Sequence, residues 1–150
     1  MSDNLLTPRF ALPMLSVAQA QKEMTHNEAL VLIDALLHAA VVDGPRATPP
    51  EAPAEGDCWI VDGAATGAWA DEAGRLALWT AGGWRFVAPL PGMRVRRISD
   101  GATLLFDGSE WTVPIAIANP EGGTTIDLEA RAAIDAMLAL MLAHGIMIAG

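Results

Sequence analysis

The fold is decided by a nine-residue stretch, Leu78-Trp79-Thr80-Ala81-Gly82-Gly83-Trp84-Arg85-Phe86, because the chain repeats its pattern. The second copy is Leu105-Phe106-Asp107-Gly108-Ser109-Glu110-Trp111-Thr112-Val113, and in both copies two aromatic residues are five positions apart. Each copy has the pattern of a β-hairpin, with a strand, a glycine-containing turn and a return strand that begins on tryptophan. The repeat therefore predicts two related hairpins.

A third strand precedes each hairpin. Gly56-Asp57-Cys58-Trp59-Ile60-Val61 lines up with Gly92-Met93-Arg94-Val95-Arg96-Arg97, and the first copy carries extra residues from Gly63 to Gly74. Two units of three short strands predict a small antiparallel, Trp-rich β-meander. Sheets this small expose edges, so we expect neighbouring copies of the chain to cover them.

The residues before the repeat have a helical pattern. Thr25-His26-Asn27-Glu28 matches a capping box, which predicts that a helix begins near His26. The stretch 17–23 also favours a helix, so two short helices with a kink at Thr25 are an alternative. An apolar stripe at helical spacing follows and consists of Leu30, Ile33, Leu36 and Leu37.

A second helix is expected after the chain break at Asn119-Pro120-Glu121-Gly122-Gly123, capped by Thr124, Thr125 or Asp127 and ended by Gly145. Steps of four and three along it give a seam of two heptads, made of Ala130, Ile134, Met137, Met141 and His144, with Leu138 and Leu142 beside it. We expect Ile134, Met137, Leu138 and Met141 to mediate oligomerisation near a symmetry axis, with a trimer favoured and a pentamer as the alternative.

These patterns predict an α+β fold in four parts. They are an N-terminal helical docking segment (1–43), a Pro-rich linker (44–55), the β-hairpin repeat module (56–114), and a linker with the C-terminal oligomerisation helix (115–150). The linker is predicted from the run Asp43–Pro53, which is too rich in proline to continue a helix.

Composition narrows the classes of partner. Nine Lys and Arg against eighteen Asp and Glu give a net charge of -9, which disfavours nucleic acid, and we interpret Arg94, Arg96 and Arg97 as a solvated face. Residues 1–7 lack the features of a signal peptide, so we expect synthesis and retention in the bacterial cytoplasm. The apolar stretch Met137–Gly150 is too short to span a bilayer, so no membrane insertion is expected.

Catalytic patterns are not found. His26, His38 and His144 lie in helical segments without a paired ligand spacing, and the single cysteine, Cys58, is expected to be buried and inert. The acids in and beside the turns show no spacing that singles out a glycosidase pair; they are Asp62, Asp71, Glu72, Asp100, Asp107 and Glu110. We therefore predict no enzyme, no cofactor and no metal site.

The five tryptophans are the remaining candidates for binding, since their flat apolar faces stack on sugar rings. Trp59, Trp84 and Trp111 repeat in strand positions and are predicted to fill the core. Trp69, isolated in the Gly- and Ala-rich insertion, is the best candidate for a contact outside the chain. Trp69 and Trp79 are the predicted glycan contacts.

A long and unusual string opens the chain: Arg9-Phe10-Ala11-Leu12-Pro13, then Ala18-Gln19-Ala20-Gln21-Lys22-Glu23-Met24-Thr25-His26-Asn27-Glu28-Ala29-Leu30, then Asp34. With Glu55–Val61, Thr66–Trp69, Leu78-Trp79, Gly83–Pro89 and Gly92-Met93, it resembles a domain-of-unknown-function family of alphaproteobacterial prophages and gene transfer agents. The resemblance covers roughly residues 8 to 113. It implies a virion protein associated with tail-fibre or head-spike genes, and it brings no known catalytic residues.

We therefore expect a non-enzymatic, homo-oligomeric structural component of a phage or gene-transfer particle, located in the virion. Since the chain ends soon after the module, a base, collar or adaptor is favoured over a receptor-binding part. Its expected partners are further copies, other virion proteins and cell-surface polysaccharide. The residues expected to dock are Gln19, Gln21, Lys22, Glu23, His26 and Asn27. The alternatives are a carbohydrate-binding module that uses exposed tryptophan and, less favoured, a small glycan hydrolase.

Overall fold

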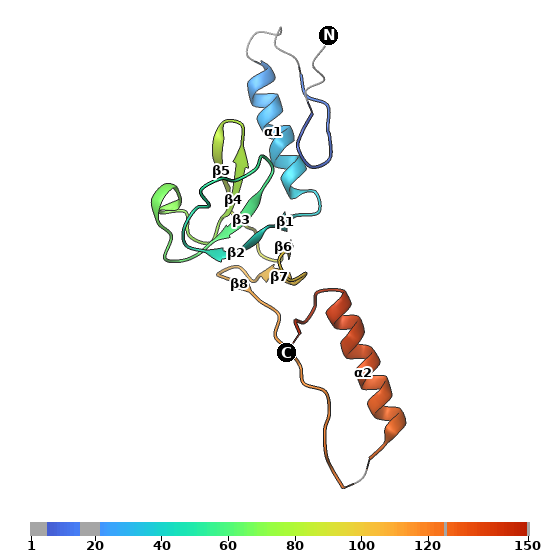
Figure 1. The fold of residues 1–150 in the computed structure, drawn as a ribbon. Coiled ribbons are helices and arrows are strands. Elements are labelled where there is room, and N and C mark those ends of the chain that lie inside the picture. Colours follow the sequence, from blue (N-terminus) through green and yellow to red (C-terminus); the bar gives the residue numbers. More distant parts are fainter. Residues whose placement is uncertain (1–5, 16–21, 125, 150) are drawn as a thin grey trace. The chain divides into compact units, whose positions relative to one another are not determined.

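The computed structural model describes residues 6–15, 22–124 and 126–149, with the backbone alone for residues 22–25. Helices α1 (Lys22–Leu36) and α2 (Leu128–Ala143) precede and follow a strand-rich middle (Figure 1), which confirms the α+β class. The chain divides into two compact units, Met1–Pro89 and Leu90–Gly150. This boundary falls inside the predicted module and separates the two copies of the repeat.

The first unit contains a four-stranded sheet in the order β2-β3-β4-β5. Its strands are β2 (Asp43–Arg46), β3 (Cys58–Val61), β4 (Leu76–Thr80) and β5 (Gly83–Val87), and the short β1 (Ala40–Val41) precedes them. β3, β4 and β5 pair antiparallel, whereas β2 pairs parallel to β3. Trp79 lies directly opposite Trp84, so the first predicted hairpin is confirmed.

The second unit repeats the antiparallel arrangement of β3, β4 and β5. Its strands are β6 (Arg94–Arg97), β7 (Thr103–Phe106) and β8 (Trp111–Thr112). β7 pairs antiparallel with both of its neighbours, and Phe106 lies opposite Trp111. The aromatic pair that is five residues apart in the sequence is thus a cross-strand pair in both units, as the repeat predicts.

Tryptophans form the core of the first unit. Trp59 and Trp69 are 3% and 0% exposed, and Trp79 and Trp84 pack against them. The ring centroids of Trp69 and Trp84 are 5.1 Å apart, and those of Trp79 and Trp84 are 4.9 Å apart, both in edge-to-face geometry. Such pairs add to the stability that comes from area burial alone. The core roles predicted for Trp59 and Trp111 are confirmed, since both are buried.

The prediction that Trp69 makes a contact outside the chain is wrong, because Trp69 is fully buried. Trp69 ends a single 3-10 turn, η1 (Gly67–Trp69), in which the amide of Trp69 donates to the carbonyl of Thr66. The turn folds the insertion back and places the indole between the rings of Trp59 and Trp84. An apolar surface as large as an indole is more stable in the core than in water, so no ring face remains for a glycan.

Two predicted boundaries also need correction. α1 (Lys22–Leu36) already includes the residues before His26, so Thr25 lies inside the helix instead of capping it. Of the alternative with two helices, residues 17–21 lie outside the described residues, and the described part is one helix without a break at Thr25. The start of the predicted linker is strand β2, which pairs with β3 from Asp43 to Arg46. Local propensity assigns the Gly44-Pro45 segment to a linker, but pairing with β3 stabilises it as a strand.

The C-terminal helix has the predicted ends. The carboxylate of Asp127 accepts a hydrogen bond from the amide of Ala130 at 2.9 Å, which is an N-cap. Gly145 follows the C-cap with φ +66°, and its carbonyl accepts a hydrogen bond from the amide of Thr103 at 2.7 Å. A Cβ at Gly145 would lie 2.2 Å from the carbonyl oxygen of Gly101. Gly145 therefore both ends α2 and ties it to the β6–β7 connection.

We expect Gly145→Ala to destabilise the second unit far more than Gly122→Ala. Both glycines have positive φ, which costs an alanine about 1–2 kcal/mol, but a Cβ at Gly122 meets nothing within 4 Å. The clash with Gly101 adds to this cost only at Gly145. Urea denaturation of the two variants measures the difference, and equal losses would contradict the assigned role of Gly145.

We expect Trp69→Ala to lower the free energy of unfolding by about 3–5 kcal/mol, because it empties the middle of the tryptophan cluster. Leu90→Ala is the control, since Leu90 is 73% exposed and should change stability by less than about 0.5 kcal/mol. Chemical denaturation monitored by circular dichroism tests both variants. A Trp69→Ala protein as stable as the control would show that the ring is not part of the core.

Candidate functional site

The N-terminal segment is fastened to α1 by one buried carboxylate. Asp34, only 1% exposed, accepts hydrogen bonds from the backbone amides of Arg9 at 2.8 Å and Phe10 at 2.7 Å. The segment itself is a tight loop. The amide of Thr7 donates to the carbonyl of Leu12, and the amide of Leu12 donates to the hydroxyl of Thr7. Two charge-assisted bonds to one buried group fix where this loop lies on the helix.

The side chain of Arg9 completes the helix end. Its guanidinium donates to the carbonyl of Ala35 at 2.6 Å and to that of His38 at 2.9 Å. The last carbonyls of a helix lack internal partners and carry partial negative charge, so a cation there is stabilising. His38 has φ +51° and ends the helical path. Arg9 and Asp34 together form a latch between the opening string and α1.

The structure describes only some of the predicted docking residues. Gln19 and Gln21 lie outside the described residues, and Lys22 and Glu23 are in the first turn of α1, where the backbone alone is described. His26 is exposed on α1. The amide side chain of Asn27 is engaged within the chain, since it accepts from the amide of Leu15 at 2.9 Å and donates to its carbonyl at 3.0 Å. Docking through the other residues stays a prediction.

An apolar face of the N-terminal segment remains in solvent. The predicted stripe is not buried by the sheet, because Ile33, Leu36 and Leu37 are 48%, 38% and 46% exposed. Phe10, held beside the helix by the latch, is also exposed and lies 6.0 Å from the His38 ring. Among the residues of α1 whose side chains are described (26–36), the buried ones are instead Asp34 and Ala35.

The C-terminal segment exposes more apolar surface. No described residue of α2 is buried. Of the predicted oligomerisation residues, Ile134 and Met137 are exposed, whereas Leu138 and Met141 are half-buried. Leu128, Leu140 and Leu142 are also exposed, the first two at 75% and 60%. The sequence pattern missed Leu128 and Leu140, because heptad steps select one seam, whereas this helix is apolar around most of its circumference.

The cysteine, the possible metal ligands and one turn carboxylate can be described individually. Burial raises the pKa of Cys58 to about 12, so this thiol is protonated at neutral pH and inert, as predicted. In the described ranges no three His, Cys, Asp or Glu side chains gather to hold a metal ion. Asp100 forms an ion pair with Arg97 across a turn, and the hydrogen bond from Arg97 lowers the pKa of Asp100 to about 2. Neither described helix is long and apolar enough to cross a membrane.

The comparison with protein-family models gives a match. Residues 26–112 match the family described as "Protein of unknown function (DUF2793)". The match runs from α1 to β8 and so includes both copies of the hairpin repeat. No curated protein matches the chain.

We expect Asp34→Ala to release the N-terminal segment. Removing a buried acceptor of two hydrogen bonds should cost about 2–3 kcal/mol and leave the amides of Arg9 and Phe10 open to exchange. Amide hydrogen exchange measured residue by residue checks this, with Glu51→Gln as the exposed control. Unchanged protection of Arg9 and Phe10 in Asp34→Ala would exclude the latch.

Proposed function

The chain belongs to the DUF2793 family, and we propose that it is a non-enzymatic structural component of a phage or gene-transfer-agent particle. It assembles with copies of itself through its C-terminal segment and docks to another virion protein through its N-terminal segment. The β-strands lie between these two segments in the sequence, and the protein acts as a base or adaptor for an appendage.

One observation carries this proposal: the exposed large apolar side chains gather toward the two ends of the chain. Six of those described lie in residues 6–37 and ten in residues 113–146, and only Leu90 and Ile98 lie between. Monomeric proteins rarely expose large apolar patches, so we infer that each end has a partner. The apolar side chains of strands β3 to β8, by contrast, are buried or half-buried within the chain.

The particle assignment rests on the resemblance of the opening string to proteins of prophages and gene transfer agents. The net charge of -9 repels phosphate backbones, so we expect the partners to be proteins and not nucleic acid. A symmetric bundle of α2 helices about an axis would bury Met137 and Leu140 at once, and a trimer is the count that we favour.

The test is the mass in solution, measured by light scattering, of the full chain and of a variant that carries both Met137→Glu and Leu140→Glu. Both side chains are exposed in the single chain, so the charges should not unfold it, but they would be buried at an α2 interface. We expect the wild-type chain to be a discrete oligomer and the variant to have the mass of one chain, 15.7 kDa.

The matched control is Leu90→Glu with Ile98→Glu, two exposed apolar residues outside both ends. It should leave the mass of the oligomer unchanged. A wild-type chain that is monomeric at high protein concentration, or equal effects of the two double variants, would refute assembly through α2.

A further inference from the structure

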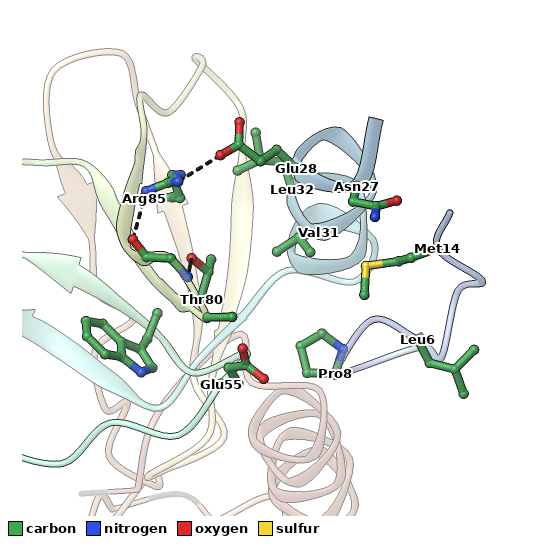
Figure 2. Close-up of a pocket in the computed structure, with 13 residues that line it drawn as sticks. Leu6, Pro8, Met14, Asn27, Glu28, Val31, Leu32, Glu55, Thr80 and Arg85 are labelled. Atoms are coloured by element: carbon green, nitrogen blue, oxygen red, sulfur yellow. Dashed lines mark hydrogen bonds and ion pairs between the residues drawn. The ribbon is translucent and has the colours of Figure 1, made fainter. Parts of the chain in front are cut away.

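A pocket of about 330 Å³ lies in the first unit between α1, the N-terminal loop and the β4–β5 hairpin (Figure 2). We call it the α1 pocket. It is lined by Leu6, Pro8, Met14, Asn27, Glu28, Val31, Leu32, Glu55, Trp79, Thr80, Ala81, Gly82 and Arg85. Its volume is at the lower end of the range for ligand sites, which suits one or two side chains or a small molecule.

The body of the α1 pocket is apolar. Val31 and Leu32 line it from α1, while Leu6, Pro8 and Met14 line it from the opening loop (Figure 2). The latch that fastens this loop to α1 thus also builds one wall of the pocket. Leu6, Pro8, Ala81 and Gly82 are exposed, so the pocket is open to solvent.

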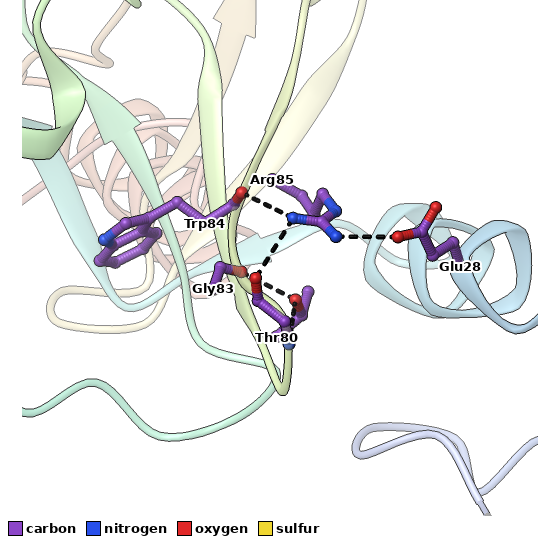
Figure 3. A network of polar contacts seen from close by, with 6 residues as sticks. Glu28, Thr80, Gly83, Trp84 and Arg85 are labelled. Carbon is purple, nitrogen blue, oxygen red and sulfur yellow. Dashed lines mark hydrogen bonds and ion pairs between the residues drawn. The ribbon is translucent and has the colours of Figure 1, made fainter. Parts of the chain in front are cut away.

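Two of the charged side chains in the lining neutralise each other. The guanidinium of Arg85 donates to the Glu28 carboxylate at 2.8 Å and to the carbonyl of Trp84 at 3.2 Å (Figure 3). A further contact reaches the carbonyl of Gly82 at 3.5 Å. Arg85 is therefore occupied by its own hairpin and by α1, and it is not free to bind an anion.

The neutral polar side chains are also engaged. The Thr80 hydroxyl donates to the carbonyl of Gly83 at 2.7 Å and accepts from the amide of Gly82 at 3.2 Å. The Asn27 amide is held by the backbone of Leu15. Sugar rings need both donors and acceptors around their hydroxyls, and these groups are already used within the chain.

Glu55 is the exception among the polar side chains of the lining. It is exposed, and none of the described residues forms a hydrogen bond or an ion pair with its carboxylate. A carboxylate only accepts hydrogen bonds, so the group that it fits is a donor, and best a cation. The pocket thus combines an apolar body with a single acceptor at its rim, on a chain whose net charge is -9.

We propose that the α1 pocket binds a basic segment of a partner protein. The segment places an aliphatic side chain between Val31, Leu32 and Met14, and an adjacent lysine or arginine pairs with Glu55. The acidic charge of the chain steers such a partner toward the site. This inference deepens the proposed function, on which it rests, by naming the chemistry of the docking partner. Assembly through α2 and binding at the α1 pocket can fail separately, because none of the residues that line the pocket belongs to α2.

The probe is an acetylated peptide amide, Ala-Leu-Lys-Leu-Ala, with matched peptides that carry Gln or Glu in place of Lys. Titration of the full, isotope-labelled chain, followed by amide NMR, should shift the signals of Val31, Leu32 and Gly82. The Gln peptide should bind roughly two- to fivefold more weakly, the range of an exposed ion pair, and the Glu peptide more weakly still.

Glu55→Gln should weaken binding of the Lys peptide by the same two- to fivefold, while the Gln peptide should bind this variant as it binds the wild type. Glu51→Gln, an exposed acid outside the lining, is the control and should bind like the wild type. Equal affinity for the three peptides, equal effects of the two Glu variants, or shifts outside the pocket would overturn the proposal. A lower oligomer mass of Glu55→Gln would also overturn it, since a second copy would then occupy the pocket.

Discussion

The cross-strand contact of Trp79 with Trp84 is the interaction on which the first unit depends. Its sheet has four short strands, and sheets of this size bury too little surface to be stable unless large side chains fill the core. Trp69, inserted from η1, joins Trp59 and Trp84 and supplies the missing volume. Because the tryptophans suffice for this core, Ile33 and Leu36 of α1 are left exposed.

The latch explains why the opening string is so distinctive. Arg9 and Phe10 bind Asp34 through their backbone amides, a contact that most residue types could make. The side chain of Arg9, however, also binds the carbonyl of Ala35 at the end of α1, which requires a long cationic side chain. Part of what the sequence suggests as a docking motif is therefore internal structure. The same contacts hold the loop that forms one wall of the α1 pocket, so stability and binding share residues here.

Local pattern was sufficient where the structure is local. The two hairpins and the Gly145 end follow from residues within a few positions of each other and are predicted from the sequence, and Asp127 is one of its three predicted caps. Burial of Trp69 was not predictable, because it depends on Trp59 and Trp84, which are distant in sequence. The α1 pocket was missed for the same reason, since its walls come from three separate segments. The strand at Asp43–Arg46 likewise needs β3 to exist.

The stability of α2 poses a separate constraint. A helix of sixteen residues is marginal in water on its own, and most helices are stabilised by burying one face. Within the chain α2 has a cap at Asp127, bonds from Arg131 to the carbonyls of Pro120 and Gly122, and the tie at Gly145. These contacts hold its ends, but they leave Met137 and Leu140 in solvent. If copies cover that surface, assembly adds to the stability of a helix that already forms in the single chain, and its unfolding temperature rises with protein concentration.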